Sequence, residues 1–446
     1  MTRRPATALL LAGALLAGCG AAEPGLVQLR HSAETPAAAA EIAGFTWAVP
    51  REPRSLDWPQ GGEAPEDTVT ANLCEPLAAL AAEIGNPEPL THVYRLRPGV
   101  RLHDGTTLTA ADAVASLRRS ADRGSGGRLS RGFDKVESIT ETGPLEVTLR
   151  LRVPDPLLSR TLAGRAGTVA SREYLAAGAP STSDGCSGPF RLAEWAPGSH
   201  ILLTRFEDYW NPAARALAGA VRFTFASGPA LVNGLLDASI EGSYLDSPTA
   251  VLRLGHSTGG RVYFGHGNAV AALDPVPGGA LDNPRRRRAL ALALDRKAIA
   301  REGFAGLAQP ADPPVPEGGG TILAAGPSPR LPLTVLDEAR QLVAETEPLG
   351  QDLVIQGGGG VEAVATAAEV LAACTRIGLP ARIGSEQPDL ALVSGAPTPA
   401  DPAWTRWIPL VQLPNTLYLN HRITGAPTGA GYLDEAWAAR IGRSRR

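Results

Sequence analysis

The stretch VYRLRPGVRLHDGTTLTAADAVASLRRS, residues 93–120, carries the clearest structural pattern in the chain. Apolar and polar residues alternate over 93–96, which predicts a strand. A Pro-Gly turn leads to a second short strand expected at 100–102, and an Asp-Gly turn ends that strand. Thr109 then precedes a helix, with Asp112 three residues later as an acidic variant of the capping box. The stretch therefore predicts a small unit of strands packed with one helix.

The rest of the chain repeats this mixture of strands and helices, without an internal repeat. Its 446 residues, 44% of them hydrophobic, are enough for two or three domain-sized cores. The fold class expected is α/β, with at least two lobes. Further strands are expected at 145–153, on both sides of the Pro197-Gly198 turn, at 220–226, 352–356 and 388–395, and helices at 284–294, 295–304 and 361–377.

The first residues are typical of an export signal rather than of a folded element. Arg3 and Arg4 precede an apolar run, 6–17, that is too short to span a bilayer. The run ends in Leu-Ala-Gly-Cys, which resembles a bacterial lipobox and makes Cys19 the expected lipid anchor. The alternative is a plain secretory signal with an incidental cysteine. We expect a lipoprotein signal peptide at 1–18, then a flexible tether at 19–44 that is rich in Ala, Glu and Pro.

Charge and cysteine content narrow the classes of protein. The formal net charge is −3, and loss of the signal removes two arginines, so no basic face is expected and nucleic acid is excluded as a partner. An exported protein folds in an oxidising compartment. Beyond the anchor, Cys74, Cys186 and Cys374 remain, an odd number that favours one disulfide and one buried thiol.

Several motifs that could carry chemistry have a plainer structural interpretation. Ser187 lacks the context of a catalytic nucleophile, since no Gly-x-Ser-x-Gly motif or recognisable histidine partner accompanies it. The four glycines at 357–360 favour a strand-to-helix turn over a phosphate loop. The basic run 285–288 favours a solvated helix face with ion pairs. The spacing of the histidines predicts no metal site, and no cofactor is expected. The histidines considered were His92, His103, His256 and His266.

Six segments, in this order, resemble one family: the extracytoplasmic solute-binding proteins of peptide/nickel-type ABC importers, bacterial family 5, which includes oligopeptide- and dipeptide-binding lipoproteins. The stretch 93–120 is similar to the family's most diagnostic signature, and the resemblance runs from about residue 45 to 446. The segments are PRSLDW, ANLCEPLAAL, YRLRPGVRLHDGTTLTAADAVASLRR, CSGPFRLAEWAPGSHILLTRFEDYW, RRRRALALALDRKAI and EVLAACTRIGLPARI.

The resemblance implies a two-lobed fold of the periplasmic-binding-protein type (type II, Venus flytrap), with an extra subdomain on lobe I. The lobes would close on a solute by hinge bending, and the closed form would dock on a permease. By this resemblance, lobe I is expected at 45–74, 185–265 and 405–446, the extra subdomain at 75–184, and lobe II at 266–404.

The same resemblance implies a function and a site. It implies a monomeric, membrane-anchored, extracytoplasmic receptor that delivers a peptide-like solute to an ABC permease and is not an enzyme. It also implies a disulfide between Cys74 and Cys186. The ligand-binding candidates that it implies are Ser187, Gly188, Asn268, Asp401 and Trp404.

One late segment, LVSGAPTPADPAW, departs from the family pattern. Val393 occupies the position of a family aromatic, and Ala396 that of the aspartate that pairs with a peptide's amino group; Asp401 could substitute. The solute is therefore not a free-amino peptide, or the cleft has lost high-affinity binding. The second case would make the chain a non-transport accessory protein of the cell envelope, built on the same scaffold with a degenerate cleft.

Overall fold

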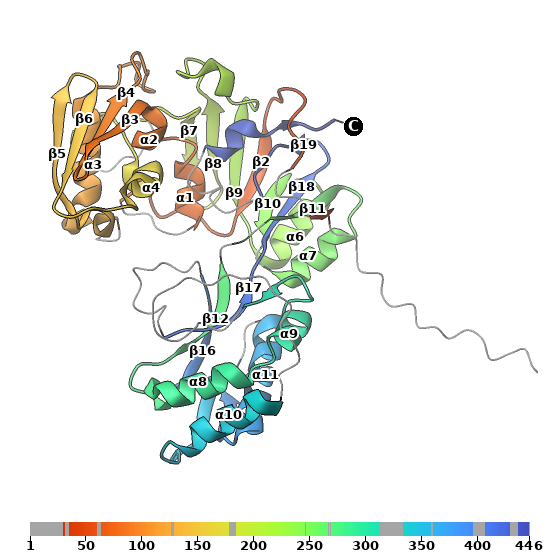
Figure 1. Ribbon diagram of the computed structural model, residues 1–446. Helices are drawn as coiled ribbons and strands as arrows, with labels where there is room; N and C mark the ends of the chain where they lie inside the picture. The colour runs from red at the N-terminus through yellow and green to blue at the C-terminus, as the bar shows by residue number, and fades with distance from the viewer. Residues whose placement is uncertain are drawn as a thin grey trace, which may run out of the picture.

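The computed structural model describes residues 30–31, 35–59, 64–125, 129–177, 184–245, 247–265, 267, 269–311, 333–357, 360–395, 406–428 and 436–445. Within these ranges the chain forms two α/β lobes, one above the other in Figure 1, with a further sheet-and-helix unit beside the upper lobe. The predicted fold class is confirmed. Four of the predicted site residues lie outside the described ranges: Cys19, Asn268, Asp401 and Trp404; so do His266 and Ala396.

Lobe I is built on an eight-stranded sheet with the order β1-β11-β18-β10-β2-β9-β8-β7. Strand β2 pairs in parallel with both β9 and β10, so the carboxyl ends of these three strands meet at one edge. Trp47 and Trp437 are fully buried in its core, with ring centroids 4.5 Å apart. The strands are β1 (Arg30–His31), β2 (Phe45–Val49), β7 (Phe190–Ala196), β8 (His200–Arg205), β9 (Ala220–Phe225), β10 (Gly242–Leu245), β11 (Gly260–Gly265) and β18 (Asn415–Asn420), and the helices are α1 (Ala64–Thr70), α6 (Gly228–Leu236) and α7 (Pro248–Gly255).

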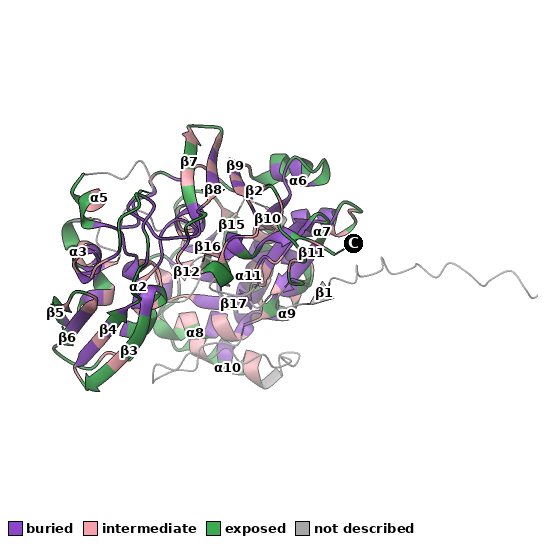
Figure 2. Ribbon diagram, turned by 90° about the horizontal axis from the view of Figure 1, so that it is seen from above, coloured by how far each residue is buried: buried purple, intermediate pink, exposed green. Residues whose placement is uncertain are grey.

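The extra subdomain is an antiparallel sheet, β3-β4-β6-β5, with helices packed on one face. The predicted capping box is present, since Asp112 Oδ2 accepts hydrogen bonds from the Thr109 backbone N–H (2.8 Å) and hydroxyl (2.6 Å). The strand expected at 100–102 is reduced to a single bridge between Arg101 and Thr107. In Figure 2 much of β3, an edge strand, is green, whereas β2 in lobe I is largely purple. The elements are β3 (Ala81–Glu88), β4 (Thr91–Leu96), β5 (Val136–Gly143), β6 (Glu146–Leu151), α2 (Leu77–Leu80), α3 (Ala110–Ala121), α4 (Leu158–Ala163) and α5 (Arg172–Ala176).

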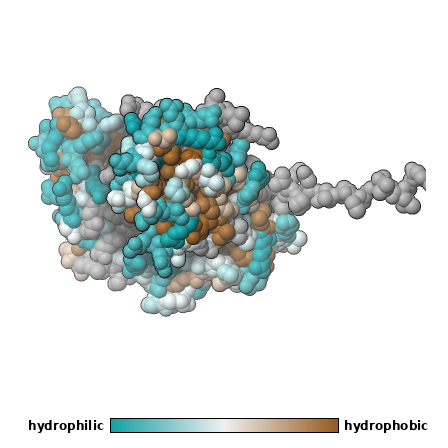
Figure 3. All heavy atoms as spheres, turned by 90° about the horizontal axis from the view of Figure 1, so that it is seen from below, coloured by the Kyte–Doolittle hydropathy of each residue, from teal (hydrophilic) through white to brown (hydrophobic). Residues whose placement is uncertain are grey.

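Lobe II contains a six-stranded sheet with the order β13-β17-β12-β16-β14-β15. The strand and the helix predicted on either side of residues 357–360 are confirmed, as β14 and α11; residues 358–359 of the predicted turn lie outside the described ranges. Seen from below in Figure 3, hydrophobic residues gather near the middle of this end of the molecule, with hydrophilic residues around them. The elements are β12 (Val270–Pro275), β13 (Gln309–Pro310), β14 (Leu353–Gln356), β15 (Ala381–Gly384), β16 (Leu390–Gly395), β17 (Ile408–Gln412), α8 (Pro284–Ala293), α9 (Arg296–Ala298), α10 (Leu333–Ala344) and α11 (Val361–Ile377).

Two adjacent chain segments join the lobes. Strand β11 continues through residues 266–269 into β12, and β17 continues through 413–414 into β18. The two segments run side by side: the Leu413 N–H donates to the carbonyl oxygen of Ala269 at 2.9 Å. Gly267 is required here, since a Cβ on it would lie 1.8 Å from the Leu413 carbonyl oxygen. Sheet membership places β17 in lobe II, so the second crossing follows β17 rather than lying at the expected boundary of 405.

Part of the expected tether is fixed against lobe I. Within 35–44, Thr35 donates its hydroxyl to the Ala426 carbonyl at 2.9 Å, and Ala40 forms a bridge with Arg443 in β20 (Gly442–Arg443), which pairs with β19 (Ile423–Thr424). Residues 30 and 31, which come earlier in the chain, form β1 and pair with β11 at the edge of the lobe I sheet. The chain is therefore held to lobe I from well before residue 44. Among the described residues, no helix has the length and apolar character that a bilayer crossing needs.

Candidate functional site

A pocket of about 270 Å³ opens at the carboxyl edge of the parallel strands of lobe I. Ligands of open α/β sheets characteristically bind at this edge. The ends of β2 and β10 contribute to the pocket, as do the two residues that follow β9 and the start of β18, immediately after the second crossing between the lobes. Its lining is Trp47, Ala48, Val49, Pro50, Thr68, Ala226, Ser227, Leu231, Ser243, Tyr244, Leu245, Pro414, Asn415 and Thr416.

Two aromatic rings fix one side of this pocket. The rings of Tyr244 and Trp47 lie 5.4 Å apart, edge to face, a favourable arrangement for aromatic pairs. The Tyr244 hydroxyl donates to the Pro427 carbonyl at 2.8 Å, which holds the ring in place. Trp47 is fully buried, whereas Tyr244 is partly exposed and is the ring that a solute can reach.

Asn415 supplies a polar group to the pocket. It stands at the first position of β18, opposite Gly265. Its side-chain Nδ2 is buried and has no hydrogen-bond partner among the residues that the structure describes. Unmatched buried donors are uncommon in folded proteins.

Ser187 and Gly188, the two predicted ligand contacts that the structure describes, lie elsewhere. Neither lines the pocket of lobe I. Ser187 is fully buried, and its hydroxyl donates to Glu75 Oε2 at 2.9 Å. Gly188 lies so close to the backbone of Leu73 that a Cβ on residue 188 would be 2.4 Å from the Leu73 carbonyl oxygen. Ligand contact by either residue stays a prediction.

These residues form the neck between lobe I and the extra subdomain. The chain leaves lobe I at Cys74-Glu75 and returns at Cys186-Ser187. The disulfide expected between Cys74 and Cys186 is present, with Cα atoms 4.7 Å apart. Beside it, the Glu75 carboxylate accepts hydrogen bonds from Ser187, from the Tyr209 hydroxyl at 2.6 Å and from the Trp210 indole at 2.7 Å. A covalent and a polar link therefore close the neck together.

Burial raises the pKa of Glu75, because removal from water disfavours its charged form; its three donors oppose the shift in part. A carboxyl group whose pKa is raised by folding binds a proton more tightly in the folded chain than in the unfolded one. Its contribution to stability is therefore present below its ordinary pKa and is lost as pH rises through the folded pKa.

We accordingly expect the stability gap between the wild type and Glu75→Gln to change with pH. The wild-type free energy of unfolding should decline relative to the variant as pH rises above about 4, the ordinary range for Glu. Because both proteins contain the same other carboxyl groups, the contribution of those groups to the pH dependence cancels in the comparison. Denaturant titrations at several pH values measure the gap, and a gap that stays constant with pH would contradict the prediction.

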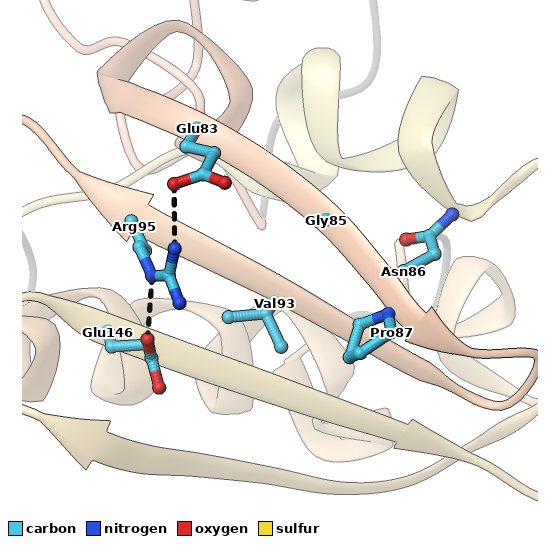
Figure 4. Close-up of a pocket in the computed structure, with 7 residues that line it drawn as sticks. All are labelled: Glu83, Gly85, Asn86, Pro87, Val93, Arg95 and Glu146. Carbon is cyan, nitrogen blue, oxygen red and sulfur yellow. Dashed lines mark hydrogen bonds and ion pairs between the residues drawn. The ribbon is translucent and has the colours of Figure 1, made fainter.

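A second hollow lies on the outer face of the subdomain sheet (Figure 4). Arg95 sits between Glu83 and Glu146, at 2.7 and 2.9 Å, and lowers the pKa of the Glu146 carboxyl. Because the arginine is exposed and is already shared between two acidic groups, it offers no free positive charge to a ligand. Among the described residues, no group of three His, Cys, Asp or Glu side chains is placed to hold a metal ion.

The arginines at 285–288, in the first turns of α8, form ion pairs and hydrogen bonds with neighbouring parts of lobe II. Arg288 pairs with Glu338 on α10 at 2.8 Å, and Arg287 donates to the Leu281 carbonyl at 2.6 Å. The predicted ion-paired helix face is confirmed. Tyr244 and Asn415, which line the pocket, are not among the predicted site residues. The only signals were their places at strand ends, which do not show by themselves which strands adjoin.

Known proteins resemble this chain in sequence and in fold. The family model described as "Bacterial extracellular solute-binding proteins, family 5 Middle" matches residues 75–378. A glutathione-binding protein, GsiB, of Escherichia coli O1:K1 is 25% identical over 248 residues, which cover 51% of this chain and 45% of that protein. The chain thus aligns with about half the length of such curated relatives.

Solved structures share the two-lobed fold at low sequence identity. The ABC transporter substrate-binding protein CtaP of Listeria monocytogenes superposes with a TM-score of 0.76 at 15% identity, covering 91% of this chain and 100% of that one. The murein tripeptide binding protein MppA of Escherichia coli gives a TM-score of 0.73 at 15% identity, covering 92% and 100%. At such identities the likeness concerns the fold alone.

Proposed function

The chain belongs to family 5 of the bacterial extracellular solute-binding proteins, and we propose that it is a receptor that delivers a peptide-like solute to an ABC importer. The observation that carries the proposal is the pocket beside the crossings between the lobes, which the partly exposed ring of Tyr244 helps to line. The receptor binds its solute and breaks no bond in it.

The way the lobes are joined supports cleft closure as part of the proposal. Two short segments connect them, so bending there rotates one lobe against the other without disturbing either sheet. A solute drives closure only by the contacts that it gains in the closed state. The closed form then presents both lobes to the permease.

Binding should appear as stabilisation of the folded protein. A solute present at 100 times its Kd adds about 2.7 kcal/mol to the free energy of unfolding. Thermal-shift measurements against peptides, sugars and metal salts are expected to reveal a shift with peptide-like solutes. The absence of a shift with every solute, together with recovery of an envelope protein on affinity capture, would favour the non-transport accessory function. This accessory function is the second candidate because Val393 and Ala396 replace the aromatic residue and the aspartate of the family pattern.

We further propose that Cys19 carries a lipid that anchors the monomeric protein to the cell membrane on its extracytoplasmic side. Several acyl chains anchor a protein stably, because each buried methylene contributes about 0.8 kcal/mol. In cells fed labelled fatty acid, the wild type should incorporate label and fractionate with membranes, whereas Cys19→Ala should do neither. Label in the variant would show that the anchor lies elsewhere.

A further inference from the structure

We infer that one edge of lobe I faces the membrane and that its arginines bind anionic lipid headgroups there. The inference rests on the proposed lipid anchor at Cys19 and goes beyond it, because a lipid alone sets no orientation. This basic edge comprises Arg261, the turn 420–422 and the C-terminal residues 443–445. In Figures 1 and 2 the C terminus and β11 lie at the end of lobe I away from the extra subdomain.

Backbone pairing brings the segments of the basic edge together. Strands β11 and β18 are antiparallel neighbours, and Arg261 stands opposite Leu419, just before the turn. Strand β19, which follows the turn, pairs with β20 near the end of the chain. The Ser444 N–H donates to the Arg422 carbonyl at 3.1 Å. The three segments therefore lie next to one another.

The basic edge carries an excess of positive charge. The described segments 247–265, 415–428 and 436–445, which form the edge and its surroundings, contain no aspartate or glutamate. The net charge of −3, from which no basic face is expected, is a sum over the whole chain and does not exclude a local basic surface. The exposed arginines of the edge are Arg261, Arg422, Arg443 and Arg445.

Acidic residues from other segments neutralise only a part of this charge. Glu241, whose side chain is 8% exposed, pairs with Arg422 at 2.8 Å. Glu41, next to the residue that bridges the edge, pairs instead with Arg205 and Arg215, at 2.9 Å in each case. The other three arginines of the edge have no acidic partner within the part of the chain that the structure describes.

The anchored end of the chain joins lobe I at the same place. Because β1 pairs in parallel with β11, the chain enters β1 from the amino end of β11, where Arg261 lies. Only residues 20–29 separate Cys19 from Arg30, and a chain of that length spans at most about 40 Å. A tether that was free as far as residue 44 would span about twice that distance. The pairing of β1 therefore keeps the basic edge close to the bilayer.

The chemistry of arginine suits a lipid surface. Guanidinium groups bind phosphate oxygens through paired N–H donors, and each arginine near an anionic membrane strengthens the attraction. A basic patch beside a lipid anchor supplies a second membrane signal. An acidic protein would offer the same kind of charge, but the short reach of the anchor favours lipid headgroups as the partner.

The test places a fluorescent probe at one end of the molecule or the other. Thr258→Cys puts a reactive thiol beside the basic edge, and Thr142→Cys puts one on the extra subdomain; both positions are exposed. The native cysteines do not compete, because two form a disulfide, Cys374 is buried and Cys19 carries the lipid. Lipidated protein is placed in phosphatidylcholine vesicles with or without phosphatidylglycerol, and quenching by a headgroup-labelled lipid is measured.

Quenching of the probe at 258 should exceed that of the probe at 142, and should rise at least about threefold when phosphatidylglycerol is present. High salt should reverse the rise. Equal quenching of the two probes overturns the inference and leaves the anchor intact. Quenching at 258 that ignores phosphatidylglycerol, as expected if the edge binds an acidic protein instead, also overturns it. Protein whose mass shows no lipid contradicts the anchor proposal and the inference with it.

A double charge reversal, Arg261→Glu with Arg443→Glu, tests the named arginines and should abolish the rise caused by phosphatidylglycerol. The matched control is Arg131→Glu with Arg160→Glu, which makes the same change of charge at exposed positions of the extra subdomain. The control should keep the rise. Thermal midpoints of both variants establish that they fold. A rise that persists in the folded edge variant overturns the role given to these arginines.

Discussion

Replacing Cys74 and Cys186 together by alanine is expected to lower the free energy of unfolding by about 2–5 kcal/mol. The two cysteines are 112 residues apart, and the chain between them is the extra subdomain. In the chain-entropy account, a link that closes a loop of this length removes much of the freedom of the unfolded chain. Denaturant titration of the double variant and the wild type measures the loss.

Two controls separate the disulfide from the loss of buried side chains. Reductant should destabilise the wild type and leave the double variant unchanged. The matched substitution Cys374→Ala removes a cysteine that is buried and unpaired on α11, and should cost only about 1 kcal/mol. The prediction fails if the double variant unfolds at the same denaturant concentration as the wild type.

Replacing Glu75 by leucine is expected to cost about 3–5 kcal/mol of folding free energy. Glu75 is only 6% exposed and accepts hydrogen bonds from Ser187, Tyr209 and Trp210. Leucine fills a similar volume but accepts none of them, and each buried donor left without an acceptor costs about 1–3 kcal/mol. The loss should therefore exceed that of an ordinary surface substitution.

The matched control is Glu83→Leu in the subdomain. Glu83 also accepts a hydrogen bond from an arginine, but its side chain is 63% exposed, so its loss should cost less than about 1 kcal/mol. Denaturant titration of both variants makes the comparison. If Glu75→Leu costs no more than Glu83→Leu, the stability of the neck does not depend on the buried carboxylate.

The hydrogen-bond partner of Ser187 could not be predicted from the sequence. Its neighbours, Cys186 and Gly188-Pro189, match a family segment, so the sequence excluded a catalytic serine and placed it near a ligand. The structure puts its hydroxyl on Glu75, more than a hundred residues earlier in the chain. No local pattern records that pairing, because a hydrogen bond across such a separation depends on how lobe and subdomain pack.

The sequence by itself determined the family, the α/β class, the capping box at Thr109, the strand and helix on either side of residues 357–360 and, through the resemblance, the disulfide. Alternation, caps and turns are local, and a family signature is linear, so each can be recognised along the chain. Only the tertiary structure decided the pocket. Trp47, Tyr244 and Asn415 come from three distant parts of the chain, and they meet because β10 pairs in parallel with β2 and antiparallel with β18. Strand pairing is set by the burial of whole sheet faces, and no residue encodes it alone.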